Sequence, residues 1–391
     1  MGAYYEFCCP TKILCGRKAL SNLPHELTGL GAKRPMILTD KGVEAAGLLA
    51  KVQAAFVDCK MEIGQIFTDV PVDSSNRVVN RIARLFKDTG CDSLVAVGGG
   101  SVIDTAKGVN IVLAQETEDL LNFQGVDRLT GTMKPFITIP TTSGTGSEVT
   151  NVAVILNEET HAKMAFVSGK LFSHVTLLDP AMLVTMPPKI TASTGMDALT
   201  HAIEAYTCLQ KNPMSDAMAL AGIRKIVENL AAAVKNGKDE NARINMADGA
   251  LMAGAAFSNS MVGMVHAIAH SVGAASRVAH GVANSILLPY GMEYNVGKAA
   301  SELSELAPLL YKGDLTGLDT KARALKAVEG VRALTAELNR LCGLPLRLSE
   351  AGVKAEQLEQ IAKLSVNDGA LTYNPEEMTW EEGLEVLKKA F

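Results

Sequence analysis

The chain has 391 residues, a length that predicts two or three domains, with one very large domain as the alternative. Of these residues 48% are hydrophobic and 20% are charged, a balance typical of a globular protein. Its formal net charge of -5, without a basic stripe, argues against nucleic acid as the main partner. The seven cysteines form no CxxC pair and are odd in number, which argues against a disulfide framework or a thiolate zinc site and favours a reducing, cytoplasmic compartment.

The first half of the chain alternates short apolar runs with helical stripes. In chain order, strands are predicted over residues 35–40, 63–67, 94–97, 136–139, 152–156 and 175–178. Helices are predicted over residues 43–57, 75–88 and 102–113. Strands that alternate with helices indicate β-α-β units, and hence a parallel sheet covered on both faces.

The alternation stops at Met186-Pro187-Pro188, and no convincing strand follows. Residues rich in Ala, Leu, Met, Glu and Lys predict helices, which include residues 217–234, 321–341 and 355–364. A last helix is predicted after Thr379, because Glu382 three residues on gives the spacing of a capping box. We therefore expect an α/β domain over residues 1–187 and an all-helical domain over residues 188–391.

The uncharged stretch over residues 249–276 is long enough to span a bilayer. It is rich in Gly and Ala, and polar residues such as His266 and His270 interrupt it. These features favour close helix packing over contact with lipid. We expect one or two buried helices here and no membrane association.

A run of glycines, Gly98-Gly99-Gly100-Ser101, follows a predicted strand and opens a predicted helix. Glycines let the backbone approach a phosphate closely, and a helix N-terminus offers free N–H groups to that anion. The alternative is a plain turn between strand and helix. The run is not the GxGxxG fingerprint, so an ordinary Rossmann site is not predicted.

A second polar loop, residues 141–148, follows the next predicted strand and contains Thr141, Thr142 and Thr145. Two such loops at the carboxyl ends of strands in one sheet favour a nucleotide-binding crevice. Asp40 ends the first strong strand and is a candidate ligand of the adenosine ribose. A carboxylate there would repel a 2′-phosphate, which favours NAD over NADP. The alternative role of Asp40 is a helix N-cap.

Two pairs of polar residues in the second half have i, i+4 spacing, Asp197 with His201 and His266 with His270, and His280 follows. On a helix this spacing puts both members of a pair on one face. Two such helices could direct a carboxylate and several imidazoles to one point, whereas the alternative is a set of buried core histidines. Oxygen and nitrogen donors suit Fe(II), Zn(II), Mn(II), Co(II) or Ni(II).

Four motifs resemble the iron-containing (group III) alcohol dehydrogenase family. They are GGGSVIDTAK over residues 98–107, IPTTSGTGSEVT over 139–150, GMDALTHAIEAY over 195–206, and the block over 263–289 with HAIAH and AHGVANSILLP. The resemblance covers nearly the whole chain, with matching order and spacing. It implies a dehydroquinate synthase-like architecture with the active site in the cleft between the two domains.

The resemblance also implies roles for single residues. Asp197, His201, His266 and His280 would bind the metal, with Fe(II) favoured and Zn(II) or Mn(II) as alternatives, and His270 would lie next to substrate and nicotinamide. Cofactor binding would involve Gly98, Gly99, Gly100, Ser101, Thr141, Thr142, Thr145, Asp40 and Lys163. One departure is Val70-Pro71-Val72-Asp73, where many relatives have a Pro-Asn-Pro run.

The expected function is an NAD-dependent, metal-dependent alcohol dehydrogenase that interconverts a small primary alcohol or diol and its aldehyde by hydride transfer. The resemblance further implies a homo-oligomer, a dimer or larger. Phe257 and Val262 are candidates for lining the substrate pocket. The competing hypotheses are a polyol dehydrogenase or metal-dependent lyase of the same superfamily, and a non-catalytic nucleotide-binding module.

Overall fold

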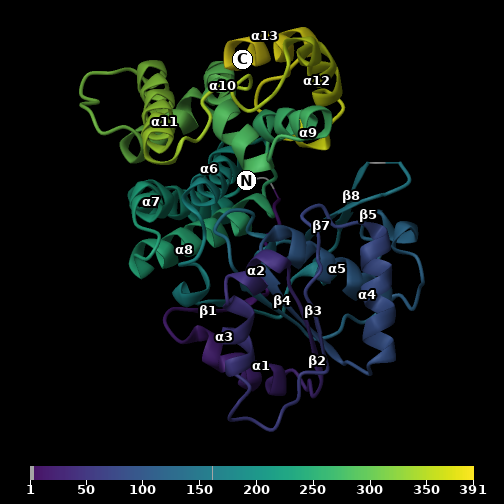
Figure 1. The fold of residues 1–391 in the computed structure, drawn as a ribbon. Coiled ribbons are helices and arrows are strands. Elements are labelled where there is room, and N and C mark those ends of the chain that lie inside the picture. The colour runs from purple at the N-terminus through teal and green to yellow at the C-terminus, as the bar shows by residue number, and fades with distance from the viewer. Residues whose placement is uncertain (1–3, 161) are drawn as a thin grey trace. The chain divides into compact units, whose positions relative to one another are not determined.

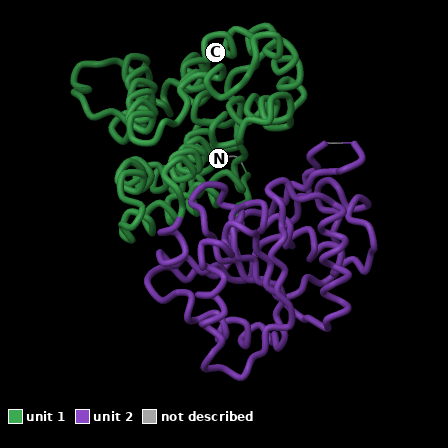
Figure 2. Tube along the Cα trace, viewed as in Figure 1, with its two compact units in different colours: residues 1–7, 186–391 green, residues 8–185 purple. Residues whose placement is uncertain are grey.

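The computed structural model describes residues 4–160 and 162–391, and the chain divides into two compact units (Figures 1 and 2). One unit is Cys8–Thr185, drawn in purple in Figure 2. The other, in green, contains Met186–Phe391 and the described residues before Cys8. The division lies close to the one expected after residue 187, but the described residues before Cys8 group with the second unit.

The first unit is built on a six-stranded parallel sheet with the strand order β1-β9-β6-β4-β2-β3. Its strands are β1 (Lys12–Cys15), β2 (Pro35–Leu38), β3 (Gln65–Phe67), β4 (Ser93–Gly98), β6 (Phe136–Pro140) and β9 (Val175–Leu178). A three-stranded sheet contains β5 (Gly125–Val126), β7 (Val152–Leu156) and β8 (Lys163–Val167). The expected parallel sheet is confirmed, although β7 pairs antiparallel with β8 outside it.

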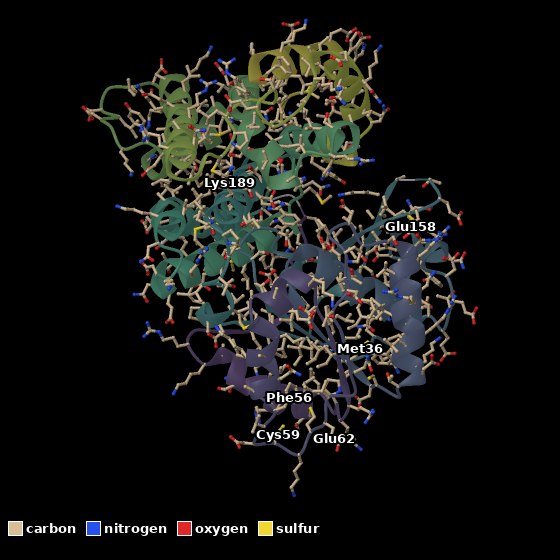
Figure 3. The ribbon with its side chains drawn as sticks, in the orientation of Figure 1. Met36, Phe56, Cys59, Glu62, Glu158 and Lys189 are labelled. Atoms are coloured by element: carbon tan, nitrogen blue, oxygen red, sulfur yellow. The ribbon has the colours of Figure 1, made fainter. Side chains whose placement is uncertain are left out.

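Helices cover both faces of the parallel sheet, as the alternating pattern predicts. They are α1 (Leu23–Gly29), α2 (Lys41–Ala45), α3 (Leu48–Ala54), α4 (Asn76–Asp88) and α5 (Gly100–Ala114), with short 3-10 helices η1 (Ala19–Asn22), η2 (Leu120–Phe123), η3 (Ser147–Val149), η4 (Gly169–Leu171) and η5 (Pro180–Met182). Met36 packs in the core beneath α4 and α5, whereas Phe56 packs in the core beneath α1 and α3 (Figure 3). The helix predicted over residues 43–57 is broken at Gly47, whose φ of 73° a helix cannot contain.

The second unit contains helices joined by loops, with no strand among its described residues. Its helices are α6 (Pro188–Thr207), α7 (Pro213–Lys235), α8 (Glu240–Phe257), α9 (Met264–Ser276), α10 (His280–Leu310), α11 (Thr320–Cys342), α12 (Leu358–Ser365) and α13 (Trp380–Ala390), with 3-10 helices η6 (Ala355–Gln357) and η7 (Gly369–Tyr373). The predicted capping box is confirmed, because the Thr379 side chain and Glu382 exchange hydrogen bonds at the start of α13. The uncharged stretch forms the second half of α8 and all of α9, and no described helix is long and apolar enough to cross a membrane.

A buried arginine fixes the start of α6, the helix that carries Asp197 and His201. Arg243 on α8 is fully buried, and its guanidinium donates to the Thr191 hydroxyl at 2.6 Å and to the carbonyl of Met186 at 2.7 Å. Burial lowers the pKa of Arg243 to about 10, which leaves it charged at neutral pH. These charge-assisted hydrogen bonds hold α6 against α8 and so set the direction in which the α6 side chains point.

Candidate metal centre

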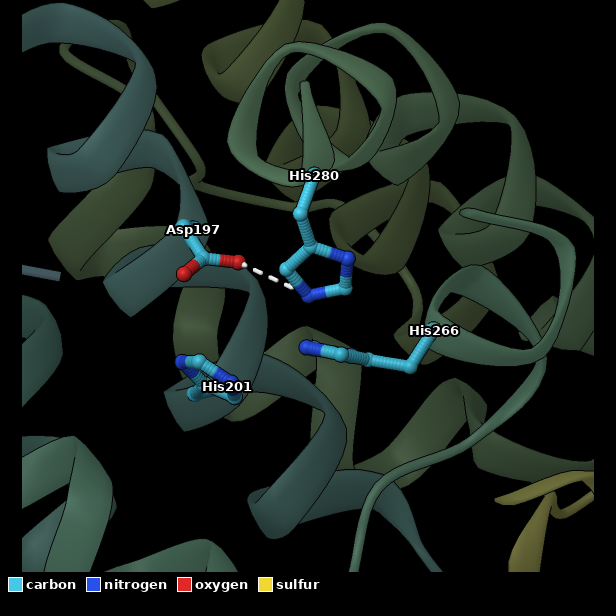
Figure 4. A group of neighbouring side chains, drawn as sticks. All are labelled: Asp197, His201, His266 and His280. Atoms are coloured by element: carbon cyan, nitrogen blue, oxygen red, sulfur yellow. Dashed lines mark ion pairs between the residues drawn. The ribbon is translucent and has the colours of Figure 1, made fainter. Parts of the chain in front are cut away.

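Four side chains from three helices meet inside the helical unit. Asp197 and His201 project from one face of α6, His266 from α9, and His280 from the first turn of α10 (Figure 4). One ligand atom from each lies within 4.8 Å of the other three. The first three residues are buried and His280 is partly buried, so the group is shielded from bulk water on most sides.

The nitrogen and oxygen atoms of this group face one another closely. Nε2 of His280 lies 3.4 Å from Oδ1 of Asp197, the contact drawn as a dashed line in Figure 4. The ring of His266 stacks on that of His201 at a centroid distance of 4.5 Å. On its other face, the ring of His201 stacks on Phe257 at 4.3 Å. Phe257, a candidate for the substrate pocket, therefore lies against a member of the group.

The amide nitrogen of Asn284 marks the point at which the acceptors of this group converge. It lies 2.6 Å from Oδ1 of Asp197, 3.0 Å from Nε2 of His280 and 3.3 Å from Nε2 of His266. An amide has only two N–H bonds, so it cannot satisfy three acceptors at once. One carboxylate oxygen and imidazole nitrogens that converge in this way fit a divalent cation of the Fe(II) or Zn(II) type.

Burial and charge give these groups the protonation states that a cation needs. Burial lowers the pKa of His280 to about 3 and that of His266 well below its ordinary value, so both rings are neutral at pH 7. Burial alone would raise the pKa of Asp197, but the neighbouring imidazoles and the Asn284 amide outweigh it and lower the pKa. An anionic carboxylate and neutral imidazoles are the forms that coordinate metals.

A second buried carboxylate lies behind His266. Oε2 of Glu204 is 2.5 Å from Nδ1 of His266, and Oε1 accepts a hydrogen bond from the backbone N–H of Val265 at 2.7 Å. Burial raises the pKa of Glu204 to about 7, although nearby backbone N–H groups act in the opposite direction. The sequence analysis missed Glu204, yet the signal was present, since it lies three residues after His201 on the same helical face.

His270 lies beside the group of four and not within it. Its ring is 47% exposed, stacks on His280 at a centroid distance of 5.2 Å, and its Nδ1 lies 2.8 Å from Oδ2 of Asp368. Asp368 also caps η7 through the N–H of Ala370. Burial alone would raise the pKa of Asp368, but the hydrogen bond with His270 contributes to a net decrease. No local pattern in the sequence links these two residues.

The two glycine- and threonine-rich loops of the α/β unit pack against each other. The N–H of Thr141 donates to the carbonyl of Gly98 at 3.1 Å, because β4 and β6 are neighbours in the sheet. A Cβ added at Gly99 would lie 3.1 Å from Oγ1 of Thr142, and one added at Gly100 would lie 2.9 Å from Cγ2 of Thr145. The Thr142 and Thr145 side chains of the second loop therefore pack directly on the glycine backbone at the N-terminus of α5.

The remaining candidates for cofactor binding make contacts of their own. Asp40 caps α2, since its Oδ1 accepts a hydrogen bond from the N–H of Val43 at 2.8 Å, so the alternative N-cap interpretation is confirmed. The cap uses one carboxylate oxygen and is compatible with a ribose contact by the other. Ser101 donates its hydroxyl hydrogen to the carbonyl of Val72. Lys163 begins β8 in the three-stranded sheet and pairs with Asp73 at 3.1 Å.

The sequence matches known families over both units. Residues 10–180 match the family described as iron-containing alcohol dehydrogenase, and residues 191–391 match the C-terminal part of the Fe-containing alcohol dehydrogenase family. The chain is 35% identical to a 1,3-propanediol dehydrogenase of Klebsiella pneumoniae over 389 residues, 99% of each chain. It is 35% identical to an NAD-dependent methanol dehydrogenase of Bacillus methanolicus over 385 residues, 98% of this chain and 99% of that one. The crystal structure of a 1,3-propanediol oxidoreductase superposes with a TM-score of 0.95 at 35% identity and covers 100% of both chains.

Proposed function

The chain belongs to the iron-containing alcohol dehydrogenase family and is an oxidoreductase that acts on alcohols, and we propose that it uses NAD and one divalent metal ion to interconvert a short alcohol or diol and its aldehyde. The names of the relatives, a 1,3-propanediol dehydrogenase and an NAD-dependent methanol dehydrogenase, support a short substrate and NAD. In the oxidative direction, alcohol and NAD⁺ give aldehyde, NADH and one proton.

The convergence of Asp197, His201, His266 and His280 is the observation that carries the proposal. These four residues would hold the metal, with Fe(II) favoured and Zn(II) or Mn(II) as alternatives. When bound there, a divalent cation supplies Lewis acidity, which lowers the pKa of a substrate hydroxyl and polarises a carbonyl in the reverse direction. The stacked rings of His201 and Phe257 restrict the volume beside the group, which suits a small substrate.

His270 is proposed to take up the proton that the alcohol loses. Asp368 accepts from Nδ1 of His270, which leaves Nε2 of a neutral ring as the basic atom. The ring lies against His280 and is also 47% exposed, so it contacts both the candidate metal group and solvent. A proton accepted on Nε2 can therefore pass to water without a further side chain.

The loops of the α/β unit are proposed to bind NAD. Gly98, Gly99, Gly100 and Ser101 would bring backbone N–H groups at the start of α5 to the pyrophosphate, and Thr141, Thr142 and Thr145 would contact the pyrophosphate and nicotinamide side. Asp40 would accept from the ribose hydroxyls. Lys163 is the weakest member of this set, because its ammonium already pairs with Asp73.

The experiment combines metal analysis of freshly purified protein with a spectrophotometric assay for NADH on a panel of short alcohols and diols. We expect one divalent metal ion per chain, and NADH formation that stops when a chelator removes the metal. Full activity after metal removal would contradict the proposal. NADH formation only with polyols would favour a polyol dehydrogenase, and no turnover of any alcohol with NAD bound would favour a binding module.

We further propose that the protein is a homo-oligomer and is located in the cytoplasm. All seven cysteines lie among the described residues and none of them forms a disulfide, which suits a reducing compartment. Light scattering on the purified protein would measure its oligomeric state, and a monomer at micromolar concentration would contradict this part.

A further inference from the structure

We propose that Glu204 is a positioning residue, which holds the ring of His266 in the tautomer and orientation that present Nε2 to the other members of the metal group. The inference rests on the proposed metal site. In this inference α6 carries two carboxylates with different functions: Asp197 would bind the metal, and Glu204 would position His266. Asp197, His201 and Glu204 follow one another at helical spacing along a single face of this helix.

The Glu204 carboxylate is buried together with the ring that it contacts. The side chains of Glu204 and His266 are 5% and 3% exposed, and Oε2 lies 2.5 Å from Nδ1. The other oxygen is fixed by the N–H of Val265 at 2.7 Å. Because both carboxylate oxygens have partners, Glu204 cannot turn away from the ring without leaving a buried N–H group unpaired.

The geometry around Glu204 favours one tautomer of His266. The carboxylate accepts hydrogen bonds from the backbone N–H groups of Val265 and His266, so both of its oxygens act as acceptors. A neutral imidazole beside an ionised, accepting carboxylate carries its single proton on Nδ1. Nε2 then presents a lone pair, and Nε2 is the atom that faces the convergence point 3.3 Å from the Asn284 amide. Figure 4 shows the ring nitrogen of His266 directed towards Asp197 and His280. A carboxylate behind a histidine ligand both orients the ring and raises its basicity.

The alternative role for Glu204 is that it merely caps α9. The N-cap residue, Gly263, has no side chain, and distant residues supply the acceptors for the first N–H groups of the helix. Glu204 accepts from Val265, and Oδ1 of Asn374 accepts from the N–H of Met264 at 3.1 Å. Asn374 therefore provides a matched control: it caps the same helix end, and its side chain bonds to Asn295 and to the backbone instead of to a histidine ring.

The test measures binding of Co²⁺ to the metal-free protein by competition with a chromophoric chelator, and records the d–d absorption bands of the bound ion. In E204Q, the amide oxygen can still accept from Val265, but the NH₂ group then faces Nδ1 and drives the ring proton to Nε2. We expect Co²⁺ to bind about 10–100-fold more weakly than in the wild type, with altered d–d bands. In N374A, affinity and spectrum should stay close to those of the wild type.

A double-mutant cycle separates this inference from the proposed function. H266A should itself weaken Co²⁺ binding, and E204Q should cause no further loss in the H266A background, because Glu204 acts through that ring. If H266A left the affinity unchanged, the proposed metal site would be wrong. If H266A weakened binding but E204Q did not, or if N374A weakened it as much as E204Q, Glu204 would have no positioning role.

The variant E204D keeps the test decisive if E204Q does not fold. Circular dichroism and thermal unfolding of each metal-free protein would establish that it folds. If E204Q does not fold, E204D takes its place, since it keeps the charge but moves the carboxylate back by one methylene. We expect weaker Co²⁺ binding in folded E204D, and wild-type affinity in that variant would overturn the inference.

Discussion

Asp368 and His270 lie 98 residues apart in the chain and are joined by a 2.8 Å contact between Oδ2 and Nδ1. This contact orients a partly exposed imidazole whose ring also stacks on His280. The pair has the geometry of a base and its orienting acid, set beside the candidate metal group and outside it.

Replacing His270 by Ala should lower turnover by about 100-fold or more, because general base catalysis contributes on that order. D368N should lower turnover less, since the ring remains but loses its orienting carboxylate. In both variants the pH profile of turnover should change while the metal content stays normal. Stopped assays across pH and metal analysis would check this, and loss of metal in H270A would make His270 a ligand instead.

Replacing Asp197 by Asn should remove most of the bound metal. The substitution deletes the anion of the group and leaves three imidazoles, and an amide oxygen is a weaker donor than a carboxylate. Elemental analysis after purification should find D197N depleted of metal and inactive, and H270A loaded. A fully loaded D197N would show that the cation binds elsewhere.

Because α10 lies close to α6 at Gly281, adding a methyl group there should affect both stability and metal binding. A Cβ added at Gly281 would lie 2.4 Å from the carbonyl oxygen of Ser193, so G281A must push the start of α10 away from α6. We expect a loss of stability of about 1–3 kcal/mol, and weaker metal binding because His280 moves away from Asp197.

A second glycine on the same helix supplies the control for G281A. A Cβ at Gly297 would approach only Oε2 of Glu376, at 3.1 Å, the far end of a flexible side chain. G297A should therefore keep wild-type metal affinity. Denaturant unfolding and metal titration of the two variants would decide, and equal metal affinity in both would contradict the prediction.

Two substitutions of Asp40 can distinguish its role in cofactor choice from its role as the N-cap of α2. Asn caps helices about as well as Asp, so D40N should keep the stability of the wild type, whereas D40A should lose about 1 kcal/mol. Both variants lack the carboxylate that repels a 2′-phosphate and should use NADP better than the wild type does. Steady-state kinetics with each cofactor would measure the change, and unchanged NAD preference in D40N would exclude Asp40 from cofactor choice.

Glu148 predicts how stability depends on pH. Burial raises its pKa to about 7, although a backbone hydrogen bond and Lys107 act in the opposite direction. The folded protein therefore binds a proton at Glu148 more tightly than the unfolded chain does. This preference contributes fully to the free energy of unfolding below pH 4.5, and the contribution is lost as the pH rises through about 7. Thermal unfolding at pH 5 and pH 8 should show wild type losing on the order of 2 kcal/mol relative to E148Q. A constant difference between the two proteins would contradict this.

Local sequence patterns were sufficient for most of the elements. The apolar run over 94–97 becomes β4, a central strand whose side chains are buried on both faces of the sheet. The helical stripe over 75–88 becomes α4, which buries one face against the core. The patterns failed for β1 and β8. Each of these strands alternates or exposes its side chains, so neither gives the continuous apolar signal of a central strand.

The sequence by itself determined which side chains share a helical face, since Asp197 with His201 and His266 with His270 follow from a repeat of 3.6 residues. Only the tertiary structure decided that His266 turns inward while His270 lies beside the group, and that Glu204 and Asp368 stand behind them. Helical periodicity fixes directions about one axis, whereas contacts between helices depend on where their axes cross, which packing of the whole core sets.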